Sequence, residues 1–465
     1  MASSTPTLDN IQGLIVRPFT HPYSRHLLFR MDDAAAGRAL LKDLSPLVTS
    51  AGHWGEVKPV ELLNLSLTYN GLTALGVDPV VLDGEMGWKN GFADEFKRSG
   101  GINPDSTGQA GFAGNSDPAT WWSDGTPKFT SSEIHLILHL YAMETPQLDD
   151  FTSRIRKLLS ASITELRPMI GGETLDSYRF EEGGVHFGYR DGISQPVINW
   201  PGLSGATPNS DFRDFLLGYA DAAHPSAPPG EFGADGSYLV FQVIHQECAA
   251  FNRLLREAAA SLAANIPEGI ANAEEWIAAK LLGRWRGGAP LANSPLADVK
   301  SLALDNGFDY GSDKEGRQCP FSAHVRVTHP RTQTVNALAQ PAPRIIRRGA
   351  PYGPPLVGEV DDGVDRGLIG MFIGASIAKQ YLKITKWMHR NDFSDVFVDA
   401  AEQDPIQGNR TLPQASGKFR IPDARGDLAL DGVPPLVKTK GAAFCFLPSL
   451  STIQKLGDGH WPRAT

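Results

Sequence analysis

Two short stretches of the sequence hold residue types that could do acid/base or metal chemistry. Residues 188–196, GYRDGISQP, place the carboxyl group of Asp191 among glycines, and residues 319–326, CPFSAHVR, place the imidazole of His324 in an apolar run. A carboxylate beside glycine is typical of a tight turn, because Asp and Gly tolerate the backbone conformations that such turns need. Taken together, the two stretches also fit a site in which the carboxylate is an acid/base and the histidine is a metal ligand.

The pattern around His324 admits two interpretations. The residue lies at the edge of a predicted strand or loop with an apolar face nearby, so a hydrogen-bonded histidine of the core is the simpler interpretation, and a metal ligand is the alternative. His135 and His139 share an apolar strand and have no HExxH pattern between them, so we interpret both as structural.

Several arginines follow the second stretch and form two clusters, which are Arg326 with Arg331, and Arg344 with Arg347 and Arg348. A run of charges is usually a solvated face. The second cluster, however, is interleaved with isoleucines and closed by GAPYG, so we expect at least one of its arginines to point inward. A buried cation needs an anionic partner, and Asp191 or the carboxylates of a ligand could supply it.

Composition limits the classes of function. The chain has 465 residues, which indicates two domains or one large duplicated domain. Hydrophobic residues make up 41% and charged residues 20%, as in ordinary globular proteins. The formal net charge is -9 and the pI is about 5.8, so we expect no binding to nucleic acid or to anionic membranes, both of which need clustered Lys and Arg.

The cysteines and the N-terminus bear on the compartment. Cys248, Cys319 and Cys445 lie far apart without a CxxC pair, so neither a disulfide framework nor a structural zinc site is indicated. No basic region followed by a long apolar region stands at the N-terminus, and no window reaches the roughly 18 apolar residues that span a bilayer. We expect a cytoplasmic protein, although a mature secreted form would look the same.

A short apolar strand pattern followed at once by an amphipathic helical pattern recurs four times, two in each half. The predicted strands of these pairs are residues 26–31, 134–141, 237–244 and 367–373. Further strand candidates are residues 62–69, 185–188, 323–328 and 441–447. Each half therefore predicts β-α-β-β-α-β, the split βαβ arrangement of a ferredoxin-like domain.

The predicted fold class is α+β, with two ferredoxin-like domains whose antiparallel sheets carry helices on one face. A stretch rich in turn-forming residues at 201–214 places the boundary near residue 210. The domains would be residues 1–210, which carry Asp191, and residues 211–465. Such a duplicated chain leaves space between sheet and helices for a ligand.

Three motifs, in this order, resemble the dye-decolorizing peroxidase family, namely GYRDGISQP at 188–196, CPFSAHVRVTHPR at 319–331 and IIRRGAPYG at 345–353. The resemblance spans nearly the whole chain and looks most like the larger subclasses of actinobacterial or fungal type. It implies a duplicated ferredoxin-like fold, similar to a dimeric α+β barrel, with one haem b per chain in the C-terminal half. It also implies an enzyme that uses hydrogen peroxide to oxidise bulky dyes, phenolics and other one-electron donors.

On one side of the haem, the resemblance implies that His324 is the proximal iron ligand. Asp404, in DPIQG at 404–408, would accept a hydrogen bond from the other ring nitrogen, although an Asp in such a loop is as often a turn residue. Arg326 and Arg331 would pair with the haem propionates.

On the opposite side, the resemblance implies that Asp191 is the distal acid/base, which moves a proton between the two oxygens of peroxide. Arg347 would stabilise the negative charge on the departing oxygen. Arg348 could have the same role, and the sequence does not distinguish the two residues well.

Bulky dyes cannot enter a buried pocket, so surface aromatics would have to pass electrons inward. By the resemblance to the family, Tyr352 and Trp387 lie at positions of such relays. The other interpretation of both residues is packing in the core.

Two alternatives remain open from the sequence. A haem-binding or iron-release protein on the same fold would need His324 but neither Asp191 nor Arg347, so their presence favours a peroxidase. A ferredoxin-like interaction module would bind no cofactor. The sequence does not indicate an oligomeric state.

Overall fold

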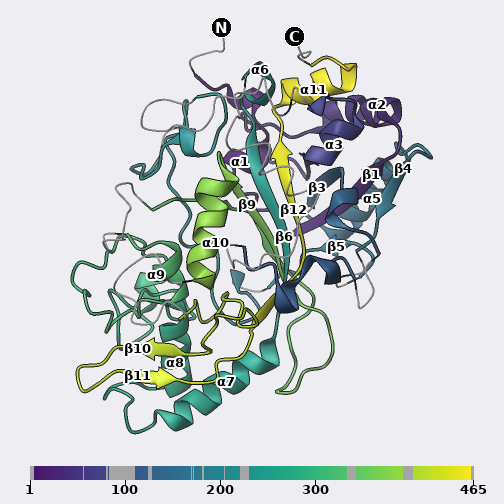
Figure 1. Ribbon diagram of the computed structural model, residues 1–465. Helices are drawn as coiled ribbons and strands as arrows, with labels where there is room; N and C mark the ends of the chain where they lie inside the picture. The colour runs from purple at the N-terminus through teal and green to yellow at the C-terminus, as the bar shows by residue number, and fades with distance from the viewer. Residues whose placement is uncertain are drawn as a thin grey trace.

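One large antiparallel sheet organises the molecule (Figure 1). The computed structural model describes residues 5–55, 57–79, 82, 110–123, 128–168, 170, 172–180, 183–203, 205–219, 230–331, 342–390 and 402–461. Within them, the large sheet has 10 strands in the order β4-β1-β3-β2-β12-β6-β9-β7, with β5 paired to β1 and β8 paired to β9.

The first half of the chain supplies one end of this sheet, in the order β4-β1-β3-β2. Its strands are β1 (Tyr23–Met31), β2 (Glu61–Thr68), β3 (Leu136–Ala142), β4 (Ile163–Leu166) and β5 (Leu175–Asp176). Its helices are α1 (Gly13–Val16), α2 (Ala34–Leu44), α3 (Tyr69–Ala74) and α5 (Thr145–Arg156). All of β3 is buried, which explains why its sequence is a nearly continuous apolar run.

The second half repeats the same strand order as β12-β6-β9-β7. Its strands are β6 (Ser237–Gln246), β7 (Ile346–Arg347), β8 (Ala350–Tyr352), β9 (Gly367–Gly374) and β12 (Val437–Leu447). Helix α7 (Cys248–Ser261) follows β6, and a π-helix (Ile377–Tyr381) that continues as α10 (Leu382–His389) follows β9. Each half is therefore a ferredoxin-like unit, and the predicted α+β fold is confirmed.

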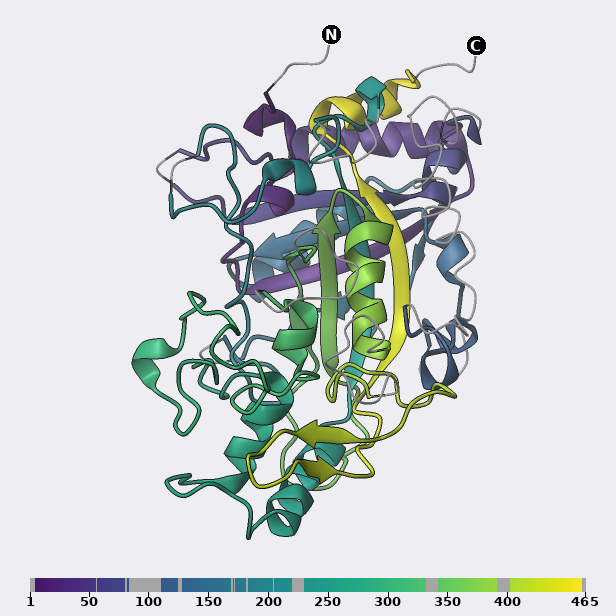
Figure 2. The same ribbon diagram turned by 60° about the vertical axis from the view of Figure 1, so that its left-hand side comes forward.

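The two halves meet edge to edge. Strand β12 of the second half pairs with β2 of the first through Cys445↔Thr68 and Phe446↔Leu67, so both units share one sheet. The remaining elements are α6 (Gly230–Gly233), α8 (Ala273–Leu282), α9 (His324–Thr328), β10 (Phe419–Ile421), β11 (Leu428–Leu430) and α11 (Leu450–Asp458). Figure 2 shows α10 standing in front of the strands of the second half, while α7, α8 and the β10–β11 ribbon lie together at one end.

Two predicted strands are wrong. Residues 323–328 form the short helix α9, although their alternating β-branched pattern favours a strand, because the side chains of His324 and Arg326 are held by tertiary partners that override local propensity. Residues 185–188 form a turn in which Gly188 has a φ of 82° and donates its N–H to the Val185 carbonyl at 2.7 Å. The missing strand of the second half is supplied by β7 and β8.

A fully buried pair of histidines lies in the first half of the sheet. His26 Nδ1 and His139 Nδ1 are 2.9 Å apart, and His139 Nε2 is 3.1 Å from the Ser66 hydroxyl. The structural interpretation of His139 fits this position. Burial lowers the pKa of His26 to about 4 and lowers that of His139 well below its ordinary value, so both rings are held neutral.

This pair predicts acid sensitivity of the fold. Below about pH 6.5 the unfolded chain protonates His26, whereas the folded chain does not until about pH 4, so the stability is lost as pH falls through this window. In the parent, the free energy of unfolding should fall by about 3 kcal/mol over this window because of His26, since each unit of pKa shift corresponds to roughly 1.4 kcal/mol. We expect the His26→Phe variant to lack this fall. Urea unfolding between pH 6.5 and pH 4 measures it, with His460→Gln at an exposed position as control. If the free energy of unfolding falls equally with pH in both variants, the prediction is wrong.

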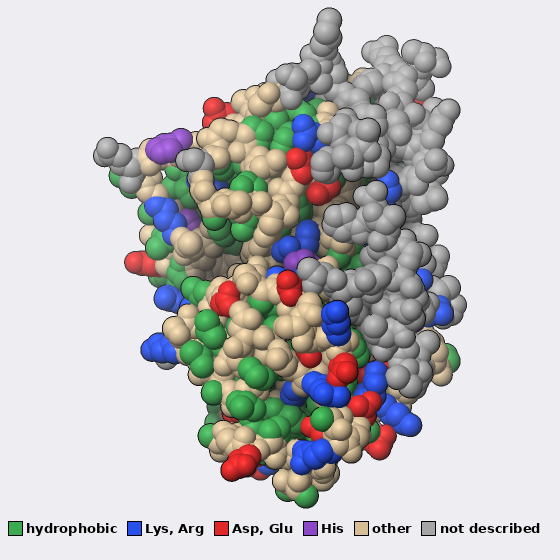
Figure 3. Space-filling view, turned by 90° about the vertical axis from the view of Figure 1, so that its left-hand side faces the viewer, with side chains coloured by type: hydrophobic (Ala, Val, Ile, Leu, Met, Phe, Trp, Pro, Cys, Tyr) green, Lys and Arg blue, Asp and Glu red, His purple; other side chains and the backbone are tan. Residues whose placement is uncertain are grey.

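Charges on the described surface are mixed. On the face shown in Figure 3, Lys and Arg side chains are interspersed with Asp and Glu rather than gathered into a basic patch. Among the helices that the structure describes, none is long and apolar enough to cross a membrane.

Candidate active site

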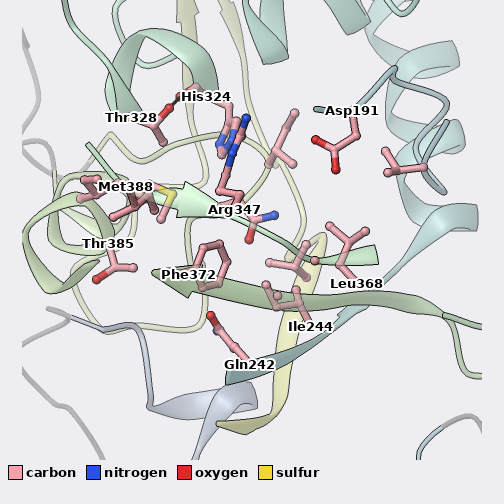
Figure 4. A pocket seen from close by; sticks show the side chains of 18 of the residues that line it. Asp191, Gln242, Ile244, His324, Thr328, Arg347, Leu368, Phe372, Thr385 and Met388 are labelled. Atoms are coloured by element: carbon pink, nitrogen blue, oxygen red, sulfur yellow. Dashed lines mark hydrogen bonds between the residues drawn. The ribbon is translucent and has the colours of Figure 1, made fainter. Parts of the chain in front are cut away.

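A cavity lies between the sheet of the second half and helices α9 and α10 (Figure 4). Its empty volume is about 1940 Å³, including open solvent at the mouth. Strands β6 and β9, both helices and the loop that carries Asp191 contribute to its walls, with side chains that include Ile244, Leu368, Phe372, Thr385 and Met388. Apolar surface predominates in the wall, as in most ligand sites, although many polar side chains also line it.

His324 begins helix α9 and faces this cavity. Its Nδ1 lies 2.6 Å from Asp404 Oδ2, and its side chain is 22% exposed, whereas that of Asp404 is fully buried. Asp404 Oδ1 accepts the N–H groups of Ile406 at 2.8 Å and Gln407 at 3.0 Å. Asp404 is thus both a turn residue and the partner of the histidine. A carboxylate that accepts from Nδ1–H leaves Nε2 with a free lone pair toward the cavity, the arrangement of a metal-ligating histidine.

Asp191 enters the cavity from a loop whose conformation depends on glycine. Gly188 and Gly192 have φ values of 82° and 79°, which favour glycine strongly. The N–H of Gly192 donates to Asp191 Oδ1 at 2.6 Å, and the backbone N–H of Asp191 donates to the Gly183 carbonyl at 3.1 Å. The second carboxylate oxygen has no protein partner among the described residues, and the carboxyl group faces the cavity (Figure 4).

Arg347 ends strand β7 and Arg348 follows it in extended backbone, where successive side chains point to opposite faces. Arg347 lines the cavity and points toward His324 (Figure 4). Arg348 lies on the other face, where it donates to the carbonyls of Leu14 at 3.0 Å and Ile15 at 3.3 Å in α1. The structure therefore distinguishes the two residues, which the sequence could not.

Gln195 connects the loop of Asp191 to the strand of Arg347. Its Nε2 donates to the Arg347 carbonyl at 3.0 Å, and its Oε1 accepts the Arg347 N–H at 3.1 Å. This two-point contact fixes the spacing between Asp191 and Arg347. Sequence reasoning did not single out Gln195, although it is part of the motif GYRDGISQP.

Arg326 and Arg331 are not brought to the cavity, contrary to the predicted contact with propionates. Arg326 is buried between the rings of Tyr310 and Phe321, and its guanidinium binds Asp313 at 2.9 Å. Arg331 lies 3.8 Å from the ring centroid of Phe308 and donates to the Phe308 carbonyl at 2.8 Å. Each fixes a loop behind the cavity wall.

Arg344 and His329 line the cavity instead. Arg344 donates to the Ser194 carbonyl at 3.3 Å and lies 3.4 Å from His329 Nε2. Burial, aided by the charges of Arg331 and Arg347, lowers the pKa of Arg344 to about 10, and burial with the nearby arginines lowers that of His329 to about 3. No described carboxylate pairs with Arg344. The sequence signal that could have indicated Arg344 is its place in the PRIIRRG cluster.

The same region tests whether the residues fit a haem. Nδ1 of His329 is buried, with no hydrogen-bond partner among the described residues. A cluster of cations without a carboxylate partner, beside an orphaned ring nitrogen, suits an anionic ligand group such as a propionate. Together with the free Nε2 of His324, the donor set fits haem.

Tyr352 and Trp387 are buried, so the prediction that they are surface aromatics is wrong. Tyr352 is 2% exposed and donates its hydroxyl to Asp365 at 3.0 Å. Trp387 is 3% exposed and packs against Phe321, in the loop before α9, and against Val327 of α9. Both side chains pack in the core, the other interpretation that the sequence allowed.

Comparison with known proteins identifies the family. A scan against protein-family models finds no match. The chain is 30% identical to a dye-decolorizing peroxidase of Mycena epipterygia, over 97% of this chain and 86% of that protein. It is 28% identical to a multifunctional dye peroxidase of an Amycolatopsis species, over 97% and 96%.

Solved structures agree. A dye-decolorizing peroxidase in complex with 2,6-dimethoxyphenol superposes with a TM-score of 0.78 at 27% identity, covering 97% of this chain and 100% of that one. The enzyme of Auricularia auricula-judae superposes with a TM-score of 0.76 at 25% identity, covering 97% and 100%. The duplicated ferredoxin-like fold and these matches define a peroxidase of the haem-dependent class. The chain belongs to the dye-decolorizing peroxidase family.

Proposed function

We propose that the protein binds one haem b and uses hydrogen peroxide to oxidise bulky dyes, phenolics and other one-electron donors. The observation that carries the proposal is the arrangement of His324, bound to a buried carboxylate, facing Asp191 and Arg347 across one cavity. The names of the relatives, and the phenol bound in one solved relative, support the donor classes.

Haem, when bound, would supply an iron centre that binds peroxide and takes up its oxidising equivalents. His324 would hold the iron through Nε2. Asp404 would keep the proton on Nδ1 and increase the electron density on the ring, which favours high oxidation states. Arg344 and His329 would take the propionate contacts that the sequence analysis assigned to Arg326 and Arg331.

Asp191 would take the proton from one oxygen of peroxide and return it to the other, directly or through water. Its carboxyl group faces the cavity and has one oxygen without a partner among the described residues, which supports this role. Arg347 would stabilise the negative charge that develops as the O–O bond breaks. No described carboxylate or carbonyl accepts a hydrogen bond from its guanidinium, so the group is available.

The alternative is a haem-binding or iron-release protein with little turnover, which would require neither distal side chain. Gln195 fixes Asp191 and Arg347 at one spacing, and this favours the peroxidase. Electron transfer through Tyr352 or Trp387, the boundary at residue 210 and the cytoplasmic location stay predictions.

An absorption spectrum tests the proposal. We expect the purified protein to show a Soret band, which changes on addition of one equivalent of hydrogen peroxide and returns on addition of 2,6-dimethoxyphenol. Absence of the band would contradict haem binding. A band that peroxide leaves unchanged would favour the haem-binding alternative.

A further inference from the structure

Phe372 is the cross-strand neighbour of Arg347. Strand β9 pairs with β7 at Arg347↔Phe372, so the two side chains stand next to each other on the face of the sheet that lines the cavity (Figure 4). An aromatic ring at this position can stack on a guanidinium, and a stacked guanidinium exposes less of its surface to a ligand.

The ring of Phe372 lies over Gly370 instead. Residues 368, 370 and 372 share the cavity face of β9, since side chains alternate along a strand. A Cβ atom at Gly370 would lie 2.7 Å from Cε2 and 2.8 Å from Cζ of Phe372, closer than such atoms approach. The ring occupies this place because residue 370 has no side chain.

Other directions are closed to the ring. The ring of Phe372 cannot move toward Gly374, because the side chain of Gln380 fills that space. A Cβ atom at Gly374 would lie 2.5 Å from Oε1 of Gln380. Gln380 is held by hydrogen bonds from its Nε2 to the carbonyls of Asp214 at 2.9 Å and Arg344 at 2.7 Å.

Toward β6, Tyr381 blocks the way. Its ring centroid is 5.4 Å from that of Phe372, and its hydroxyl donates to Gln242 Oε1 at 2.8 Å. A Phe372 ring displaced from Gly370 therefore turns toward Arg347 and the cavity.

We infer that Gly370 is a positioning residue for the distal arginine. By leaving room for the Phe372 ring, it keeps the ring away from the Arg347 guanidinium, which then binds an anionic ligand opposite His324. This inference rests on the proposed function, in which Arg347 contacts the ligand of the haem iron. Gly370, which has no side chain, would then be one of the residues that decide how Arg347 contacts this ligand.

Cyanide titration of the haem-loaded ferric protein tests the inference, with the Soret shift as readout. We expect Gly370→Ala and Gly370→Leu to raise the cyanide Kd by about 10-fold or more, the loss expected for one hydrogen bond to a charged group. The atoms in the way belong to the end of a side chain, and Gly370 has no positive φ, so the Ala variant should fold. Gly205→Ala, where a Cβ meets nothing within 4 Å, is the matched control.

A second substitution separates positioning from a general defect. Adding Phe372→Ala to Gly370→Ala removes the displaced ring, so we expect the cyanide Kd to return to within about threefold of the parent. Failure of this rescue would overturn the inference, because the effect would not act through Phe372.

Arg347→Leu in the same titration separates the inference from the proposed function. If Arg347→Leu weakens cyanide binding and the Gly370 variants do not, the inference is wrong and the proposed function stands. If Arg347→Leu has no effect, the proposed role of Arg347 fails, and the inference fails with it.

Discussion

Asp191→Asn lowers the rate of reaction with hydrogen peroxide by about 10²- to 10⁴-fold, the usual contribution of general acid/base catalysis, while the protein keeps its haem. The amide has the same shape and can still accept the Gly192 N–H, which donates to Asp191 Oδ1 at 2.6 Å, so the loop is preserved. It cannot take up and return a proton. Stopped-flow absorbance of the Soret band after mixing with peroxide measures the rate.

Asp309→Asn is the matched control for this experiment. Asp309 also accepts the N–H of a glycine, Gly311, at 2.8 Å, but it lies outside the cavity lining. We expect it to react like the parent. If Asp191→Asn is as fast as the parent, the proton transfer does not pass through this carboxylate, and Arg347 alone must account for the distal chemistry.

The second large effect concerns haem binding itself. We expect His324→Ala to purify with at least about 10-fold less haem than the parent, because the replaced side chain is the proposed iron ligand. The ratio of Soret absorbance to protein absorbance measures it. Imidazole added during reconstitution should restore haem binding, because it fills the place of the missing ring.

The control for His324→Ala is His53→Ala, at an exposed position away from the cavity. We expect full haem content there. If His324→Ala retains haem like the control, the proximal assignment is wrong. Loss of haem without rescue by imidazole, in a protein with unchanged circular dichroism, would also speak against it, because the defect would lie elsewhere than the vacated ligand position.

The apolar strands of this fold could be predicted from the sequence, because a buried strand has a nearly continuous apolar pattern. Strand β3, with all of its residues buried, is an example, and the β-α-β-β-α-β order of each half follows from such segments. Residues 323–328 show the limit. Their pattern is that of a strand, but Asp313, 13 residues from Arg326, and Asp404, 80 residues from His324, hold them in a helical turn.

For the site, the three motifs predicted the place of some residues but not of others. Asp191, His324 and Arg347 line one cavity, as the motifs implied. Arg326 does not, because its direction is set by Asp313 and two aromatic rings that local sequence does not reveal. A charged side chain is long and flexible, so its partner, rather than its position in a motif, decides where its charge lies.

The two-point contact of Gln195 with the backbone of Arg347 also bears on how the enzyme matures. One amide group joins the loop of Asp191 to the strand of Arg347, so the backbone segments that carry these two residues are held together. The contact uses protein atoms alone, so it forms on folding. If the protein binds haem as proposed, the backbone that carries Asp191 and Arg347 would be in place before the cofactor enters.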